Sequence, residues 1–290
     1  MQLPVLTVNH ISLERQDPDL RPWYERCGVA LLTGTVLLIV LAVACSSRSS
    51  PAGSPTVVTL ECSTGSSEAS TDVEIIGSIP HRGAVWTEGL LLDEGLLWES
   101  TGEPSGSGVR ALDPATGDVL WTVSNGEAFF AEGLARAFGR TYVLSYQNGV
   151  VYTFDRSATP PFRPFAEYDG QGWGLTVVRD SLVNSNGSSI LYYRDPETFD
   201  VQKAVEITYE GEPVQQLNEL EYDSRYIWAN QWLTPFVYRI DEDDPCRIVR
   251  YELPGLCPDG HLNGIAWDAE EGLFYVTGQE CERIWKVRFR

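Results

Sequence analysis

The stretch Phe129-Phe130-Ala131-Glu132-Gly133-Leu134 places a carboxylate beside two aromatic rings and a glycine, and its last three residues recur along the chain in altered form. Related triplets begin at Glu88, Trp173, Asn218 and Asn263, so that successive copies lie 44, 41, 45 and 45 residues apart. A repeat of roughly 40–50 residues is typical of β-propellers, in which each repeat forms a blade of four strands. The sequence therefore predicts an all-β, five-bladed β-propeller.

A second recurring element gives the same number of blades. Short apolar strands recur with spacings of 45, 40, 45 and 47 residues, at Leu97–Ser100, Tyr142–Ser145, Leu182–Ser185, Ile227–Asn230 and Phe274–Thr277. Asp-Pro turns at residues 112–117 and 193–198, and an acidic turn at 240–244, separate later strands. No long segment shows a helical period.

The N-terminal part has a different composition. Residues 1–26 are polar and mixed in charge, residues 27–45 carry no charge, and residues 46–72 are rich in Ser, Gly, Thr, Pro and Ala. An uncharged run of about 19 residues can cross a bilayer as a helix, and Arg21 and Arg26 before it favour a cytoplasmic N-terminus. Three interpretations stay open for 27–45: a transmembrane anchor, a lipoprotein signal that ends at Cys45, and a cleaved signal peptide of a secreted protein.

We therefore expect four parts: a cytoplasmic segment (1–26), a transmembrane or lipoprotein signal segment (27–45), a flexible linker (46–72) and the propeller (73–290). The propeller would be tethered to the membrane on the extracytoplasmic side. Four cysteines, Cys62, Cys246, Cys257 and Cys281, follow the signal segment. Two disulfides are expected in an oxidising compartment, and four cysteines allow three pairings. In one of them Cys246–Cys257 would close a hairpin and Cys62–Cys281 would tie the start of the domain to its last blade; four free, buried thiols are the alternative to disulfides.

The composition also argues against nucleic-acid binding and against a zinc enzyme. Asp and Glu outnumber Lys and Arg by 41 to 21, for a formal net charge of −20. Nucleic acid is not expected to bind so acidic a chain. With 3 His and neither a His-x-x-x-His nor a Cys-x-x-Cys pair, a zinc enzyme is not expected either.

The leading residues of the five triplets are candidates for a functional site. Inner strands of all blades line the channel of a propeller, so we expect a ring that comprises Glu88, Glu132, Trp173, Asn218 and Asn263. Burial and a second carboxylate nearby would raise the pKa of either glutamate toward the range that is useful for acid–base catalysis. For Glu132 a functional role is favoured. For Asn263 a purely structural role explains the sequence equally well.

Several motifs together resemble the plant-type glutaminyl-peptide cyclotransferases over about residues 73–290. The motifs are those at Thr87–Leu90, Leu97–Gly102, Gly172–Leu175, Leu217–Tyr222, Ile227–Asn230 and Leu262–Ala266. The resemblance implies a five-bladed propeller that converts an N-terminal glutamine of peptides or proteins to pyroglutamate and releases ammonia. It implies no required metal or cofactor. We expect a monomer.

The resemblance also implies roles for individual residues. The acid–base glutamate of the family corresponds to Glu132, its indole walls correspond to Trp173 and Trp232, and Asn218 is suited to stabilise the oxyanion. The remaining substrate contacts would come from Trp86, Glu88, Phe130, Tyr146 and Gln279. Trp228, which precedes Trp232 on the same strand, is expected to pack in the core.

The chain departs from the family pattern at the site. The family's Phe-Thr-Gln-Gly-Leu is Trp86-Thr87-Glu88-Gly89-Leu90 here, its Leu-Thr-Trp-Gln is Leu144-Ser145-Tyr146-Gln147, and Gln279 stands where a lysine is common. The changes at 88 and 279 make the site more negative by two charges. Such a site would either hold an α-ammonium group tightly and slow the reaction, or let Glu88 and Glu132 share a proton.

Two other functions are consistent with the sequence. A ring of Glu and Asn oxygens suits Ca²⁺ or a similar cation, as in a metal-assisted propeller hydrolase of the lactonase type. The same aromatic channel would also suit a non-catalytic propeller that binds peptide N-termini or sugars.

Overall fold

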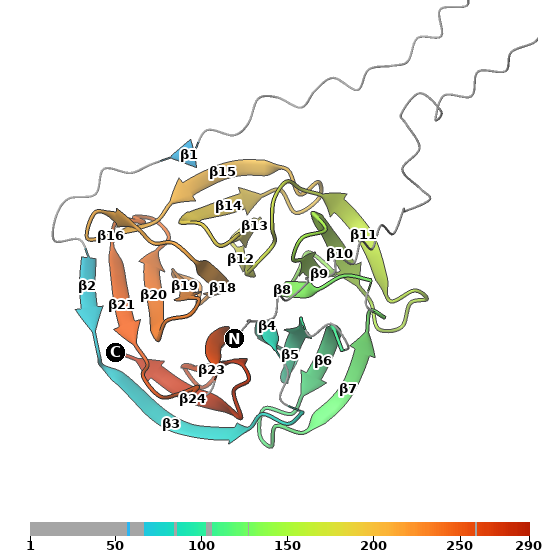
Figure 1. Cartoon of the computed structure of the whole chain (residues 1–290), viewed down its shortest axis with the longest axis horizontal. Coiled ribbons are helices and arrows are strands. Elements are labelled where there is room, and N and C mark those ends of the chain that lie inside the picture. Colours follow the sequence, from blue (N-terminus) through green and yellow to red (C-terminus); the bar gives the residue numbers. More distant parts are fainter. Residues whose placement is uncertain (1–56, 59–66, 84–85, 103–105, 127, 259) are drawn as a thin grey trace, which may run out of the picture. The chain divides into compact units, whose positions relative to one another are not determined.

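Five antiparallel sheets surround a common axis in this structure, a computed structural model (Figure 1). It describes residues 57–58, 67–83, 86–102, 106–126, 128–258 and 260–290. Each sheet is a propeller blade whose first strand lies nearest the axis. The inner strands are β4 (Thr87–Asp93), β8 (Ala131–Ala137), β12 (Leu175–Val178), β18 (Leu217–Tyr222) and β22 (His261–Asp268). The predicted five-bladed propeller is confirmed, and the recurring triplets lie on or directly before these inner strands.

The second strands contain the recurring apolar segments to within one residue. They are β5 (Leu96–Thr101), β9 (Arg140–Ser145), β13 (Ser181–Asn184), β19 (Tyr226–Gln231) and β23 (Leu273–Gln279). The third strands are β6 (Gly108–Leu112), β10 (Val150–Phe154), β14 (Ile190–Arg194), β20 (Phe236–Asp241) and β24 (Arg283–Phe289). The outer strands are β7 (Val119–Ser124), β11 (Phe162–Glu167), β15 (Val201–Glu206), β21 (Ile248–Glu252) and β3 (Val73–Pro80). The three predicted turns join third to outer strands.

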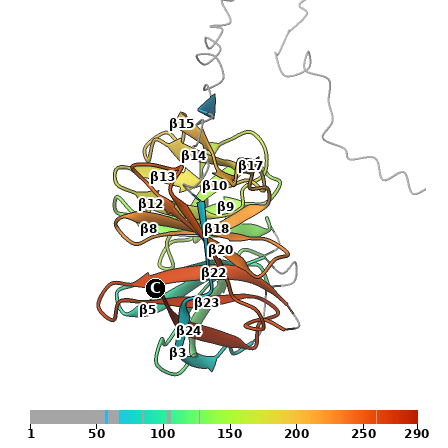
Figure 2. The same cartoon turned by 90° about the vertical axis from the view of Figure 1, so that its left-hand side faces the viewer.

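The ring closes with strands from opposite ends of the domain. The outer strand of the last blade is β3, which pairs antiparallel with β24 from Arg283↔Pro80 to Phe289↔Val73 and lies beside it in Figures 1 and 2. Two further strands, β1 (Val57–Val58) and β2 (Ser67–Ser70), pair parallel with β15 and β21. The connection from β15 to β18 contains a small hairpin of β16 (Thr208–Tyr209) and β17 (Glu212–Pro213).

The core lies between neighbouring blades and is rich in aromatic rings. Trp228 is buried, and its ring centroid lies 4.6 Å from those of both Phe274 and Phe289. Trp228 therefore packs in the core, as expected. The segments 1–26 and 27–45 lie outside the described residues, so the predicted membrane segment stays a prediction. Among the residues that the structure describes, no helix is long and apolar enough to span a membrane.

Candidate active site

A cavity of about 360 Å³ lies at the end of the propeller where the chain enters the inner strands. Nine side chains line it: Trp86, Glu88, Phe130, Glu132, Tyr146, Trp173, Asn218, Trp232 and Gln279. These are the nine residues for which the sequence predicts a catalytic or substrate-binding role. The structure brings all nine together from five blades, and their individual roles stay predictions.

The inner strands are irregular where the leading residues of the triplets lie. The pairing of inner with second strands shifts register at 87/89, 131/134, 217/220 and 262/264. Such a β-bulge re-aims a side chain relative to the regular ladder. Glu88, Glu132 and Asn218 lie at three of these bulges and face the cavity.

The glycine that follows the leading residue lets neighbouring inner strands approach each other closely. A Cβ atom on Gly133 would lie 2.4 Å from the amide nitrogen of Leu175, and one on Gly174 would lie 2.1 Å from the carbonyl oxygen of Asn218. Both distances are too short for any side chain. The fourth triplet is the exception, because Glu219 occupies the glycine position.

Glu219 ties three blades together near the axis. It is fully buried, and its carboxyl oxygens accept hydrogen bonds from the backbone amides of Leu90 at 3.3 Å and Ile265 at 2.9 Å. Burial raises its pKa well above the usual range. Two residues further along the strand, Glu221 lines a second cavity, of about 310 Å³, between the inner strands. Sequence reasoning assigned no role to either residue, although the glutamate in place of a glycine was a visible signal.

Glu88 is buried and held by two amide side chains. Nδ2 of Asn263 donates to its Oε2 at 2.6 Å, and Nε2 of Gln279 donates to both carboxyl oxygens at 2.9 and 3.1 Å. Burial raises the pKa of Glu88 to about 8, against the opposing effect of these two hydrogen bonds. Asn263 therefore has a structural role toward Glu88.

Glu132 is equally buried, but its carboxyl group makes no hydrogen bond to the described residues. Its backbone is fixed instead, since Oγ of Ser100 donates to the carbonyl oxygen of Glu132 at 2.6 Å. Burial, followed by the negative charge of Glu88, raises the pKa of Glu132 well above its usual range. Glu132 thus has the environment of a carboxyl group that can exchange a proton with a bound molecule.

A buried charged cluster lies behind Glu88. Glu99 accepts hydrogen bonds from Thr87 at 2.6 Å and from Nε of Arg110 at 2.6 Å, and it lies 3.0 Å from Nε2 of His81. Burial alone would raise the pKa of Glu99, but the interactions with His81 and Arg110 outweigh burial and hold it at about 2. Sequence reasoning missed this cluster. Its signal in the sequence was a glutamate that directly follows the apolar residues Leu96–Trp98 of the second strand.

Aromatic rings form the walls of the cavity. The rings of Trp173 and Trp232 meet edge to face, with centroids 5.6 Å apart and an interplanar angle of 81°. Phe130 and Tyr146 form a second pair, with centroids 5.8 Å apart. Trp86 is 42% exposed and forms part of the rim. Flat apolar walls of this kind suit the methylene groups of a flexible side chain.

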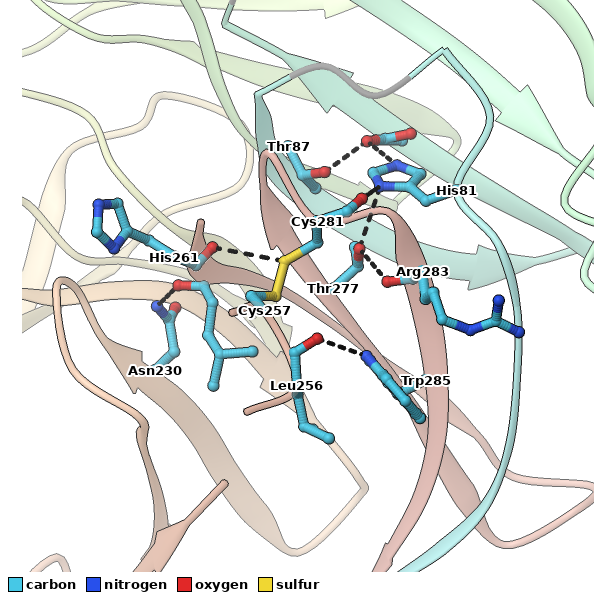
Figure 3. The surroundings of a disulfide bond; sticks show 12 residues. His81, Thr87, Asn230, Leu256, Cys257, His261, Thr277, Cys281, Arg283 and Trp285 are labelled. Carbon is cyan, nitrogen blue, oxygen red and sulfur yellow. Dashed lines mark hydrogen bonds and ion pairs between the residues drawn. A yellow bond between two sulfur atoms is a disulfide. The ribbon is translucent and has the colours of Figure 1, made fainter. Parts of the chain in front are cut away.

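Gln279 connects one of these walls to Glu88. Its Oε1 accepts a hydrogen bond from Nε1 of Trp232 at 3.3 Å, while its Nε2 donates to Glu88. A disulfide joins Cys257 to Cys281, two residues after Gln279, with Cα atoms 5.0 Å apart (Figure 3). The carbonyl oxygen of Cys281 lies 2.8 Å from Nδ1 of His81. The loop that carries Gln279 is therefore held from both sides.

This disulfide belongs to one of the three pairings that the sequence left open, and it excludes the one with Cys246–Cys257 and Cys62–Cys281. Cys257 bonds to Cys281 rather than to Cys246, and Cys281 is not available to Cys62. The reason is topological: the loop before β22 and the loop after β23 meet at the same end of the last blade. Cys246 is disulfide-bonded as well, and Cys62 lies outside the described residues.

Asn218 retains hydrogen-bonding capacity inside the site. Its Oδ1 is buried and has no hydrogen-bond partner among the described residues. Its backbone carbonyl accepts a hydrogen bond from Ser185 at 2.6 Å, which fixes the strand. Because the two amide atoms are distinguished only by their hydrogen bonds, either orientation leaves Asn218 able to bind a polar ligand atom.

Known proteins resemble this chain over the whole propeller. A sequence model of the glutamine cyclotransferase family matches residues 39–289, a range that contains every residue lining the cavity. A glutaminyl-peptide cyclotransferase of Arabidopsis thaliana is 32% identical over 229 residues, which cover 76% of this chain and 72% of that protein. The crystal structure of a glutaminyl cyclase from Myxococcus xanthus is similar with a TM-score of 0.68 at 31% identity, over 77% of this chain and 97% of that one.

Proposed function

The chain belongs to the glutamine cyclotransferase family, and on this premise we propose that Glu132 carries a proton between the two nitrogens of a substrate's N-terminal glutamine. The activity is that of a glutaminyl-peptide cyclotransferase, which forms pyroglutamate and releases ammonia. Peptides or proteins with an N-terminal glutamine are the substrates.

The reaction makes limited demands on the enzyme. The α-amine attacks the γ-carbonyl of the same residue, so the site must select the folded conformer in which the two groups meet. The amine must be neutral to attack, and the departing nitrogen must gain a proton. The carboxylate of Glu132 accepts a proton from the α-nitrogen as the ring C–N bond forms. It then donates that proton to the amide nitrogen as ammonia leaves, so its own charge is restored.

Other residues of the cavity support this reaction in the proposed mechanism. The amide of Asn218 donates to the γ-carbonyl oxygen as negative charge develops on it. Trp173 and Trp232 enclose the methylene groups and exclude water. The observation that carries the proposal is the carboxyl group of Glu132, which is buried, faces the cavity and makes no hydrogen bond to the described residues.

The test is to incubate the purified protein with a peptide that begins with glutamine and to follow the loss of ammonia by mass spectrometry. Glu132→Gln should lower kcat by about 10²- to 10⁴-fold, the usual contribution of general acid–base catalysis. Glu221→Gln is the matched control, because Glu221 is a half-buried glutamate on an inner strand with a raised pKa but lies outside the site cavity. Equal rates for wild type and Glu132→Gln would refute the assignment.

We also propose that the enzyme works outside the cytoplasm as a membrane-tethered monomer. The uncharged segment 27–45 supports the tether, whether it is an anchor or a lipoprotein signal. The Cys257–Cys281 disulfide supports an oxidising compartment. A site assembled from the five blades of one chain supports a monomer. Protease accessibility of the propeller on intact cells would test its location.

A further inference from the structure

We propose that Glu280 is a specificity-determining residue that favours substrates with Lys or Arg directly after the N-terminal glutamine. This inference rests on the proposed cyclisation, since it concerns the side chain that follows the reacting residue. It names a substrate class, cationic N-terminal peptides, within the general activity.

Glu280 lies at the rim of the cavity on a well-anchored loop. It directly follows Gln279, which lines the cavity, and directly precedes Cys281 of the disulfide. Its Oε1 lies 3.4 Å from Nε1 of Trp86, the exposed rim residue. A hydrogen bond of that length is weak, so the carboxylate stays available to a second partner.

The backbone of Glu280 is fixed in an uncommon conformation. Its φ of 56° lies in the left-handed region, which residues other than glycine adopt infrequently. The hydrogen bonds of Gln279 to Glu88 on one side and the Cys257–Cys281 disulfide on the other hold the chain there. The carboxylate is therefore presented from a rigid support rather than from a long loop.

The geometry of the substrate brings its second side chain to this rim. The amine and the side chain of the first residue must both reach Glu132, which lies inside the cavity. The rest of the peptide must then leave through the mouth, where Trp86 and Glu280 lie. An ammonium or guanidinium group on the second residue would meet the Glu280 carboxylate there.

The loops at this end of the propeller carry almost no positive charge. Two kinds of loop lie at this end: those that precede the inner strands β8, β12, β18 and β22, and those that join the second strand of each blade to the third. The described residues of these loops include no Lys or Arg. The acidic residues described there are Asp169, Glu210, Glu212, Glu280 and Glu282. Arg82, ahead of β4, is ion-paired with Asp118 at 2.7 Å. A basic substrate would thus approach without repulsion, and an acidic one would be disfavoured.

The experiment compares kcat/KM for peptides of equal length that begin Gln-Lys, Gln-Ala and Gln-Glu, at low and high salt. Exposed ion pairs are weak, so wild type should prefer Gln-Lys over Gln-Ala by about 1.5- to 5-fold. The preference should arise in KM, because the contact is the same in the ground and transition states, and it should shrink at high salt.

Variants separate a local contact from the overall charge. Glu280→Gln should bring the Gln-Lys to Gln-Ala ratio toward one, and Glu280→Lys should make Gln-Glu better than Gln-Lys. Glu270→Gln makes the same charge change in the exposed turn between β22 and β23, at the opposite end of the same blade, and should leave the ratio unchanged.

Three results would overturn the inference: no preference in wild type, a preference that survives Glu280→Gln, or an equal loss in Glu270→Gln. Failure of wild type to cyclise Gln-Ala would instead refute the proposed activity itself. The two failures are therefore distinguishable.

Discussion

Replacing Glu88 by glutamine should change the pH dependence of the enzyme more than its rate at neutral pH. The amide has nearly the same shape and can still accept a hydrogen bond from Asn263 or Gln279, but it cannot ionise. In the wild-type protein, burial raises the pKa of Glu88 to about 8. The substitution therefore keeps the neutral form of this position at every pH.

The expected size of the effect follows from that pKa. A group with a pKa of about 8 is ionised in roughly a tenth of the molecules at pH 7 and in roughly nine tenths at pH 9. Once Glu88 ionises, its negative charge favours the α-ammonium form of the substrate, which cannot attack. The same charge favours the protonated form of Glu132, which cannot accept a proton. Wild-type kcat/KM should therefore fall about tenfold between pH 7 and pH 9 relative to Glu88→Gln.

The assay is a pair of pH–rate profiles for ammonia release from one Gln-initiated peptide. The variant should stay level or rise above pH 7, as the free amine of the substrate loses its proton, while wild type declines. The apparent pKa values belong to the Glu88–Glu132 pair, so the ratio of the two profiles is the informative quantity. Glu270→Gln controls for net charge. A ratio that stays constant from pH 7 to pH 9 would show that Glu88 does not ionise in this range.

Two further substitutions test packing and electrostatics. Gly102→Ala would place a Cβ atom 2.1 Å from the ring of Phe130 and 2.8 Å from Cγ of Glu88. Displacing this wall of the cavity should raise KM and lower the unfolding free energy by about 1–3 kcal/mol. The control is Gly77→Ala, which should change neither quantity because nothing lies within 4 Å of its Cβ atom. Glu221 has a pKa that burial raises from 4.5 to about 7, so its stabilising contribution is complete below pH 4.5 and is lost as the pH rises through 7. Glu221→Gln should remove up to about 3 kcal/mol from the decline in unfolding free energy between pH 4.5 and pH 8, as measured by urea denaturation. An unchanged decline would mean that Glu221 does not take up a proton on folding in this range.

The repeat in the sequence was sufficient to predict the blades and the site because both depend on the same period. Positions that match between repeats lie at matching heights on the inner strands, so Glu88, Glu132 and Asn218 had to converge once the ring closed. Trp173 belongs to the same ring of matching positions, whereas Trp232 followed from the family resemblance. These features are local in each repeat, and only the closure of the ring is needed to assemble them.

Contacts between different repeats could not be predicted in the same way. The partner of Cys281 depends on which two loops meet at one end of a blade, and the spacing of cysteines does not contain that information. Glu219 was missed because its partners, the backbone amides of Leu90 and Ile265, belong to two other blades. The period identifies Glu219 as the residue at a position that is glycine in the other repeats, but it does not show which groups of other blades its carboxyl group contacts.

The most informative contact of this kind is the one between Glu88 and Gln279. In the sequence these residues are two separate departures from the family pattern, and together they make the site formally more negative by two charges. The structure shows that they are one hydrogen-bonded pair, with Gln279 as the donor and Glu88 as the acceptor. A glutamine at 88 and a lysine at 279, the residues of the resembling family, can also form a donor–acceptor pair. The exchange from Gln and Lys to Glu88 and Gln279 therefore keeps a hydrogen bond between the two positions, and the ionisable residue is now the acceptor at 88 instead of the donor at 279.

With a pKa of about 8, Glu88 is mostly neutral at pH 7, so the charge that the site carries at this pH is less negative than the residue types alone indicate. The departures at 88 and 279 are therefore consistent with an active enzyme at neutral pH.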